Sequence, residues 1–235
     1  MKKLPVKAVL YVSLGFIVLT WVDKVIRNVF HMENILRTFE SLPRVFLQAL
    51  LTGLWTVFSV TVLLLLSRES YRDVGFRKQD LLRQLRNGCL FGLLIFILDT
   101  IVLSPILEAV LPPTSAQGID MARLFDQAFF LPVFIFIALF KGGFSEELWR
   151  VFILTRFEKA LGRPGLVLAL VLSSAAFGVG HLYQGVSGMI SIGLIGFLYA
   201  LVYLRKRLML EAVFAHAAFN LIQIVLGYIV YSGKS

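Results

Sequence analysis

The sequence predicts an all-α protein, a polytopic transmembrane helical bundle with about seven or eight membrane helices. Of its 235 residues, 58% are hydrophobic and only 16% are charged. Soluble domains, by contrast, are about 45–50% apolar and about 25% charged. The apolar residues fall in blocks of about 18–22, and a helix of that length crosses a hydrocarbon core of about 30 Å. The excess apolar surface must therefore face lipid, which excludes a soluble globular protein.

Seven apolar blocks are expected to span the membrane. The first is the N-terminal stretch to Val22, which we interpret as a retained span because no small-residue cleavage pattern follows it. The fourth block is long and is interrupted at Gly142-Gly143, so it leaves room for an eighth helix. The connections 23–44 and 71–87 are expected to lie on the membrane surface. The later spans cover residues 45–66, 88–111, 128–155, 164–181, 186–204 and 208–231.

The net charge of +9 is interpreted as a topology signal and not as a nucleic-acid signal. When Lys and Arg are summed over alternate loops, one set of loops carries 15 and the other carries 6. Because cytoplasmic loops retain basic residues, the N-terminus is expected in the cytoplasm and the C-terminus outside. The single cysteine, Cys89, excludes an internal disulfide framework and a cysteine metal cluster.

A few polar residues interrupt the apolar blocks, and most of them lie in the C-terminal half. A charge at bilayer depth costs roughly 2.5–3.5 kcal/mol, so each one is a functional candidate. Their clustering predicts one site assembled by the later helices, with the first two spans acting as packing or partner surface. The residues are Asp99, Lys141, Glu146, Glu147, Arg150, His181 and His216, together with Asn220.

The first cluster holds three charges within five helical residues. Glu146 and Arg150 are four residues apart and Glu147 and Arg150 are three apart, so the guanidinium can reach either carboxylate. Two adjacent carboxylates in a low dielectric do not both stay ionised cheaply. Arg150 is therefore expected to hold one as an anion and to leave the other free to exchange protons, although a structural ion-pair cluster is equally compatible with the pattern.

Two histidines complete the candidate site. His181 follows a run of small residues that lets a neighbouring helix approach, and His216 and Asn220 lie four residues apart on the last helix. Counted from the inner arginines at about 1.5 Å per residue, Glu146 and His216 lie at a similar depth. His181 reaches the same level if residues 161–165 form the turn of a helical hairpin. The alternative for each histidine alone is a structural hydrogen bond between helices.

These side chains fit the hydrolysis of a peptide or amide bond. A carboxylate with an imidazole can activate water, and an imidazole with a carboxamide can donate to the oxyanion of a tetrahedral intermediate. Glu146, His181 and His216 also form a two-histidine, one-carboxylate set, which is a ligand count used by catalytic zinc. Zinc is therefore a possible cofactor, while the preferred interpretation requires none.

The three motifs, in this order on late helices, resemble the type II CAAX prenyl endopeptidase family, also called the CAAX protease and bacteriocin-processing, or Abi, family. Its pattern is Glu-Glu with a downstream Arg, then Phe-x-x-x-His, then His-x-x-x-Asn. Phe177/His181 and His216/Asn220 match the second and third motifs position for position. The resemblance implies an intramembrane endopeptidase in which the first glutamate and His181 activate water while His216 and Asn220 stabilise the oxyanion. Members are often described as metalloproteases, but the resemblance favours a glutamate mechanism without metal.

The first motif departs from the family pattern by one residue. The family has Glu-Glu-x-x-x-Arg, whereas Glu146-Glu147 is followed by only two residues before Arg150. Alignment on the glutamates makes Glu146 the water activator, and we favour it because Glu146 can pair with Arg150 and matches His216 in depth. Alignment on Arg150 instead puts Ser145 at the position of the first glutamate.

The function expected from the sequence is an endopeptidase acting on a membrane-associated protein or peptide, with membrane lipid and that substrate as partners and no nucleic acid. The catalytic residues would be Glu146, Glu147, Arg150, His181, His216 and Asn220. One membrane domain, 1–235, is expected, with peripheral helices in 1–67 and a protease-like core at about 70–230. We expect a bacterial plasma-membrane location with the site toward the cytoplasm. The alternatives are a non-catalytic membrane adaptor of the same fold and a proton-coupled carrier using Asp99.

Overall fold

The computed structural model describes residues 6–31, 35, 37–111 and 124–232, and these form helices without any strand. Apolar blocks become helices here because the backbone must satisfy its own hydrogen bonds in lipid. The long α-helices are α1 (Val6–Phe30), α3 (Leu42–Ser67), α4 (Leu81–Leu98), α8 (Glu147–Val179), α9 (Gly185–Lys206) and α10 (Met209–Ser232). Shorter segments are η1 (Arg37–Glu40), η2 (Tyr71–Val74), η3 (Asp99–Leu103), α5 (Ser104–Val110), α7 (Phe130–Phe136), η4 (Ile137–Glu146) and η5 (Leu182–Gln184).

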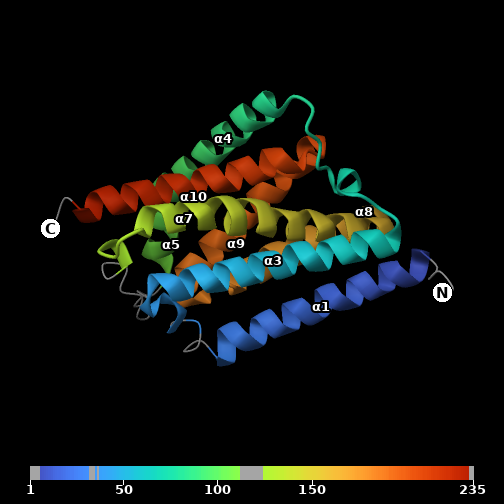
Figure 1. Cartoon of the computed structure of the whole chain (residues 1–235), viewed down its shortest axis with the longest axis horizontal. Helices are drawn as coiled ribbons and strands as arrows, with labels where there is room; N and C mark the ends of the chain where they lie inside the picture. Colours follow the sequence, from blue (N-terminus) through green and yellow to red (C-terminus); the bar gives the residue numbers. More distant parts are fainter. Residues whose placement is uncertain (1–5, 32–34, 36, 112–123, 233–235) are drawn as a thin grey trace.

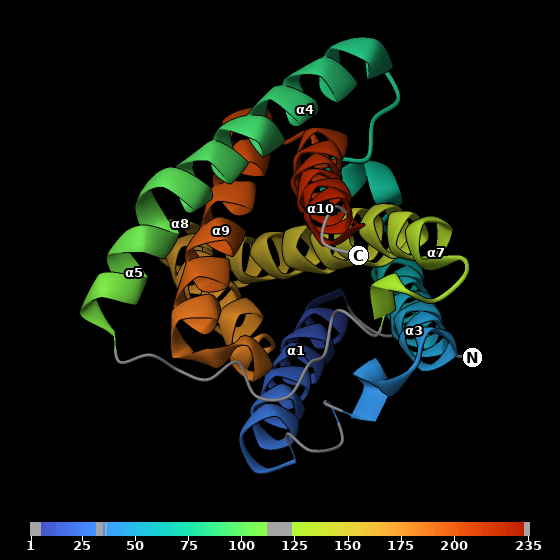
Figure 2. The same cartoon turned by 90° about the vertical axis from the view of Figure 1, so that its left-hand side faces the viewer.

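The long helices lie along one another as a bundle (Figure 1). The view in Figure 2 shows α10 in the middle, with α4, α9, α7 and α8 around it, and α10 packs against each of these elements. α1 lies at the edge of the bundle, where it contacts α8, α3 and η5. The helix that carries the His216 motif is therefore the central one, and the first helix covers one side.

Six helical stretches among the described residues are long and apolar enough to cross a membrane. The fourth runs for 50 residues from Phe130 to Val179 and contains Gly162 at φ 66° and ψ −148°. A Cβ on Gly165 would lie 2.3 Å from the carbonyl oxygen of Phe157, an approach that a continuous helix does not allow. The chain therefore reverses at the predicted turn, and the two arms of this stretch correspond to the predicted spans 128–155 and 164–181.

Three boundaries differ from the prediction. α1 continues to Phe30 instead of ending at Val22, so residues 23–30 are not a surface connection. α4 begins at Leu81, inside the expected surface stretch 71–87. Gly142-Gly143 lies within η4, and no eighth spanning helix begins there in the described chain. The first helix thus continues through Asp23 and Lys24, which were expected in the connection 23–44. Residues 32–34 and 36 of the expected connection 23–44 lie outside the described residues.

Two stretches have π-helical hydrogen bonding, which pairs residues five apart. η3 follows α4 without a break, and η4 joins α7 to α8. Single π turns inside α-helices are often found at functional sites. η4 ends at Glu146, so the widened segment includes the first glutamate of the first motif.

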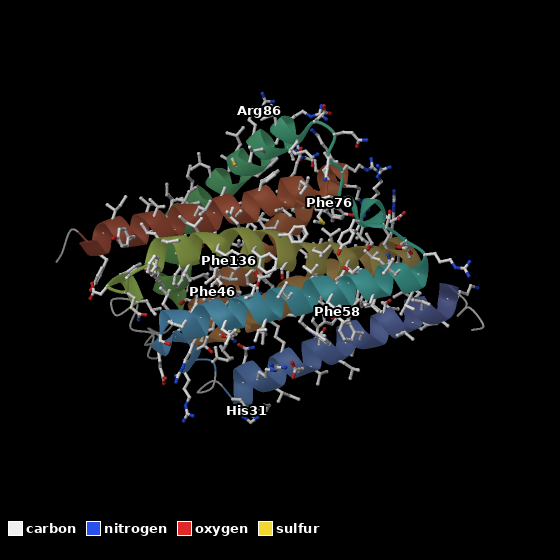
Figure 3. All side chains as sticks on the ribbon, viewed as in Figure 1. His31, Phe46, Phe58, Phe76, Arg86 and Phe136 are labelled. Carbon is white, nitrogen blue, oxygen red and sulfur yellow. The ribbon has the colours of Figure 1, made fainter. Side chains whose placement is uncertain are left out.

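The core lies mainly between α3, α8, α9 and α10, and large apolar side chains also cover the outside of the bundle. Phe58 on α3 is 60% exposed, as expected for a lipid-facing side chain. Phe46 of α3 and Phe136 of α7 lie side by side, with ring centroids 5.4 Å apart (Figure 3). Aromatic contacts of this kind hold α3 against the segment that leads into the first motif.

Candidate active site

Arg150 pairs with Glu147 and not with Glu146. Its Nε donates to both carboxylate oxygens of Glu147, at 3.2 and 3.1 Å, and both side chains are buried. No Arg150–Glu146 ion pair occurs among the described residues. The predicted Glu146–Arg150 pairing is therefore wrong, although Arg150 does hold one of the two carboxylates as expected. The three-residue spacing brings the buried pair together on one helical flank.

Glu146 is paired with Lys141 instead. The ammonium group of Lys141 donates to Glu146 Oε1, and both side chains are about a quarter exposed. These residues are five apart within the π-helical segment η4, where the hydrogen-bond pattern places residues i and i+5 above one another. Spacing rules for an α-helix, which were the basis of the sequence analysis, do not predict this pair.

His216 lies between the two glutamates. Its Nδ1 is 2.9 Å from Glu147 Oε1, and its Nε2 is 3.8 Å from Glu146 Oε2. An ionised carboxylate can only accept a hydrogen bond, so Nδ1 carries a proton and donates it to Glu147. The ring of Tyr199 stacks on the imidazole at 4.5 Å and 17°. His216 is thus fixed by one carboxylate and directs its other nitrogen toward the second.

Phe177 of the second motif connects the buried groups. The Arg150 guanidinium lies 4.5 Å from the centre of its ring, and the ring of His216 meets it edge-on at 5.8 Å. A Cβ on Gly196 would lie 2.6 Å from Phe177 Cδ1 and 3.0 Å from Arg150 Nη1. A glycine on α9 therefore leaves the space in which the guanidinium and the ring stack.

His181 lies just beyond the end of α8, in a turn. Its Nδ1 is 2.9 Å from the carbonyl oxygen of Phe177, which can only accept, so Nδ1 donates this hydrogen bond. In the neutral ring, Nε2 is then the nitrogen with a free lone pair. The ring of Phe177 contacts both histidines, with ring centroids 5.0 Å from His181 and 5.8 Å from His216. The structure thus brings all three predicted groups, Glu146, His181 and His216, into one neighbourhood, as the depth argument expected.

Asn220 can lie at the site because Gly142, the residue beside it on η4, has no side chain. A Cβ on Gly142 would lie 2.4 Å from Asn220 Nδ2 and 3.4 Å from His216 Nε2. The missing side chain allows η4 and α10 to approach closely enough for the carboxamide to lie beside the imidazole. The described residues offer the Asn220 carboxamide no hydrogen-bond partner, so its donors are available to another molecule.

The site has a buried part and a partly exposed part. Glu147, Arg150 and His216 are at most 3% exposed, and they bind one another. Glu146, Lys141, His181 and Asn220 are only partly buried. The buried residues can position their partly exposed neighbours, while the partly exposed residues can meet a substrate.

The described residues do not fit the zinc alternative. No group of three His, Cys, Asp or Glu side chains placed to hold a metal ion occurs among them. Within the predicted set, the ammonium group of Lys141 takes one oxygen of Glu146. The ammonium group of Lys141 thus occupies the position beside Glu146 Oε1 that a metal ion would have to take.

Asp99 belongs to a different part of the structure. Its carboxylate accepts hydrogen bonds from Ser104, at 3.2 Å, and from Ser191 of α9. Those hydrogen bonds fasten η3 and α5 to α9. Neither oxygen of the Asp99 carboxylate contacts Glu146 or the histidines. The structure therefore does not connect Asp99 to the proton relay that the carrier alternative requires.

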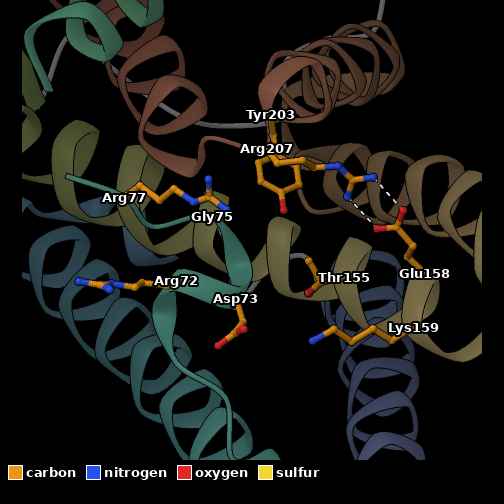
Figure 4. Close-up of a pocket in the computed structure, with 9 residues that line it drawn as sticks. All are labelled: Arg72, Asp73, Gly75, Arg77, Thr155, Glu158, Lys159, Tyr203 and Arg207. Atoms are coloured by element: carbon orange, nitrogen blue, oxygen red, sulfur yellow. Dashed lines mark hydrogen bonds and ion pairs between the residues drawn. The ribbon is translucent and has the colours of Figure 1, made fainter. Parts of the chain in front are cut away.

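A cavity of about 220 Å³ lies at one end of the bundle, away from this site (Figure 4). Within it, both terminal nitrogens of Arg207 donate to Glu158, at 2.7 and 2.8 Å. It contains none of the predicted site residues. Its lining consists of Arg72, Asp73, Gly75, Arg77, Thr155, Glu158, Lys159, Tyr203 and Arg207.

Lys24 and Tyr199 are the site residues that the sequence analysis missed. Lys24 was placed in a surface connection, but the ammonium group of this α1 residue lies 5.7 Å from the centre of the Phe177 ring. The apolar residues Val25, Ile26 and Val29 that follow it could have indicated a longer first helix. Tyr199 gave no signal, because an aromatic residue in an apolar helix is usually a packing residue.

Residues 127–222 match the family model of the Rce1-like type II CAAX prenyl endopeptidases. The matched segment contains all three motifs, so the resemblance predicted from them is confirmed for this part of the chain. Comparison with curated proteins and with solved structures finds no match in either set. The six candidate spans, together with this match, support an integral membrane protein.

Proposed function

We propose that the chain is an intramembrane endopeptidase that hydrolyses a peptide bond of a membrane-associated protein or peptide. The observation that carries this proposal is the placement of His216, whose Nδ1 is fixed by Glu147 while its Nε2 lies 3.8 Å from Glu146. A carboxylate and an oriented imidazole that face each other in a partly buried site are suited to moving the protons of a hydrolysis. The family match supports the same reaction class.

In the proposed reaction, Glu146 assisted by His181 takes a proton from a water molecule as the water oxygen bonds to the carbonyl carbon. The electron pair of the carbonyl double bond moves to its oxygen. That oxyanion accepts a hydrogen bond from the Asn220 amide and, when the ring is protonated, from His216 Nε2. Collapse of the intermediate breaks the carbon–nitrogen bond, and the proton held by the Glu146–His181 pair passes to the leaving amine.

The supporting residues keep this arrangement in place. Arg150 balances the charge of the buried Glu147 carboxylate. The same carboxylate accepts a hydrogen bond from His216 Nδ1. Lys141 holds one oxygen of Glu146 and leaves the other toward His216. Groups fixed before the substrate arrives need no reorganisation during the reaction, which is the main source of electrostatic catalysis.

The proposal also includes orientation and partners. The excess of Lys and Arg in alternate loops favours a cytoplasmic N-terminus and a site toward the cytoplasmic side of a bacterial plasma membrane. Membrane lipid and a membrane-associated peptide substrate are the proposed partners. No metal is required in this mechanism.

Cleavage by the full chain in proteoliposomes tests the proposal, with a library of lipid-anchored fluorogenic peptides as the probe. We expect Glu146→Gln and His181→Gln each to lower kcat about 10²–10⁴-fold. Glu108→Gln changes an exposed carboxylate outside the site and should leave the rate unchanged. Cleavage that is insensitive to both site variants, or no cleavage of any peptide by the wild-type chain, would contradict the proposal.

The adaptor alternative is favoured by one observation, the direct pairing of Lys141 with Glu146. An ammonium group held permanently on the carboxylate would prevent it from acting as a base. The adaptor therefore predicts that Lys141→Met does not change any activity of the chain. The endopeptidase proposal predicts that this variant alters the cleavage rate, because the orientation of Glu146 depends on the pair.

A further inference from the structure

Lys24 brings a positive charge to the site that no acidic side chain neutralises. Its ammonium group forms no hydrogen bond and no ion pair with the described residues. It lies over the Phe177 ring, and a Cβ on Gly180 would be 2.6 Å from its Nζ. A glycine next to His181 therefore makes room for this side chain, which is partly buried.

The charges around the site do not balance. Lys24, Lys141 and Arg150 are three cations, whereas Glu146 and Glu147 are the two carboxylates that face them. Arg150 is matched by Glu147 and Lys141 by Glu146, so the unmatched cation is Lys24. With both imidazoles counted as neutral, the site carries one excess positive charge, and protonation of either ring would only increase it. An unpaired charge at this depth is unfavourable, so a bound anion would be stabilised.

We propose that Lys24 binds a carboxylate of the substrate on the His181 side of the site. The inference rests on the proposed peptidase function, because carboxylates are the anions that an unmodified peptide offers, either at its C-terminus or on an acidic side chain. An ammonium group has three donors and no acceptor, and a charge-assisted hydrogen bond to a carboxylate would satisfy it. α1, which lies outside the segment that matches the family model, would then contribute to substrate choice.

The test measures binding, so it does not depend on cleavage. The full chain with Asn220→Ala, which is expected to slow cleavage and leaves the Lys141–Glu146 pair in place, is purified in lipid-free detergent, with Lys24 retained or changed to Met or Arg. Three fluorescent decapeptides of one apolar sequence are compared. The first ends in a free carboxylate, the second in a carboxamide, and the third in a carboxamide with one internal glutamate in place of glutamine. Lys7→Met, an exposed lysine on the same helix, is the matched control.

With Lys24 present, we expect at least one carboxylate peptide to bind roughly tenfold or more tightly than the neutral peptide. Lys24→Met should remove this difference without weakening the neutral peptide, and Lys24→Arg and Lys7→Met should keep it. Preference for the first peptide identifies a terminal carboxylate as the ligand, and preference for the third identifies an acidic side chain. Equal binding of all three peptides, absence of binding, or a difference that survives Lys24→Met overturns the inference.

Cleavage by the chain with Asn220 intact separates this inference from the proposed function. If the peptides are cleaved but Lys24 does not affect their binding, only the carboxylate assignment fails. If carboxylate binding depends on Lys24 but no peptide is cleaved, the peptidase proposal fails and the anion site remains.

Discussion

Glu147 and His216 are 69 residues apart in the chain, and Glu147 Oε1 lies 2.9 Å from His216 Nδ1. Arg150 binds the same carboxylate from the other side. The second of the paired glutamates is thus a buried residue that orients the imidazole. The first glutamate, Glu146, is partly exposed and faces the other ring nitrogen at 3.8 Å. The two adjacent carboxylates therefore have different surroundings and are suited to different tasks.

Replacement of Glu147 should damage both stability and activity. Glu147→Gln leaves the buried Arg150 without a counter-charge, and breaking a buried pair costs about 3–5 kcal/mol. The amide also cannot hold His216 Nδ1–H as a carboxylate does, so we expect kcat to fall about 10²-fold or more. Thermal unfolding in detergent and the cleavage assay measure the two effects.

Glu158→Gln provides the matched control, because it removes a carboxylate from an Arg pair on the same helix. The Glu158–Arg207 pair is about one-third exposed, and such pairs contribute about 0–1 kcal/mol. If the two variants changed the midpoint of unfolding equally, the buried role assigned to Glu147 would be wrong.

A methyl group at Gly142 should affect activity more than stability. The Cβ of Gly142→Ala would lie 2.4 Å from Asn220 Nδ2, which is the end of a side chain that can rotate away. The fold can therefore survive while the carboxamide is displaced, and loss of one oxyanion donor lowers kcat about 10²–10³-fold.

Gly15→Ala is the control for Gly142→Ala, since no atom lies within 4 Å of a Cβ at that glycine. We expect it to leave both the unfolding midpoint and the cleavage rate unchanged. Normal cleavage by Gly142→Ala would argue against a catalytic role for Asn220.

The ring of Tyr199, but not its hydroxyl group, should be needed. The ring stacks on His216, whereas its buried oxygen has no hydrogen-bond partner among the described residues. An unsatisfied buried polar group costs about 1–3 kcal/mol, so Tyr199→Phe should keep activity and keep or raise the unfolding midpoint. Tyr199→Leu removes the stacking and should lower both. A loss of cleavage in Tyr199→Phe would show that the hydroxyl takes part in the reaction.

The pH dependence of stability should include a contribution from Glu69, which lies in the loop after α3. Burial alone would raise the pKa of this carboxyl, but hydrogen bonds from Arg156 and Lys159 outweigh burial and lower it. A carboxyl whose pKa is lower in the folded state stabilises the fold above its unfolded pKa of about 4.3. This stabilisation is lost as the pH falls through the lower, folded value.

We therefore expect the unfolding midpoint of the wild-type chain to fall on acidification from pH 6 to below about pH 4. The decrease should be smaller in Glu69→Gln, which lacks the titrating group. Asp73→Asn is the comparison, because that exposed loop carboxyl is held by Ser70 and not by a buried arginine. Parallel curves for the wild type and Glu69→Gln would contradict the assignment.

The sequence predicted the spans after residue 160, the hairpin turn and the shared depth of Glu146 and His216. These features follow from local chemistry, since apolar length sets a span, Gly162 and Pro164 favour a turn, and helix rise converts residue number to depth. The early boundaries were less well predicted. The connection was expected to begin at residue 23, whereas α1 continues to Phe30 and brings Lys24 to the Phe177 ring.

What the sequence determined by itself was a helical membrane protein with three polar motifs on late helices. Hydrophobicity and helical spacing are local properties, so they follow directly from the order of the residues. Tertiary structure alone decided which groups pair. η4 widens the helix and brings Lys141 to Glu146, so Arg150 binds Glu147, and α10 places His216 between the two carboxylates. Pairing depends on the backbone geometry of one segment and on the approach of distant helices, and neither can be obtained from spacing along an ideal α-helix.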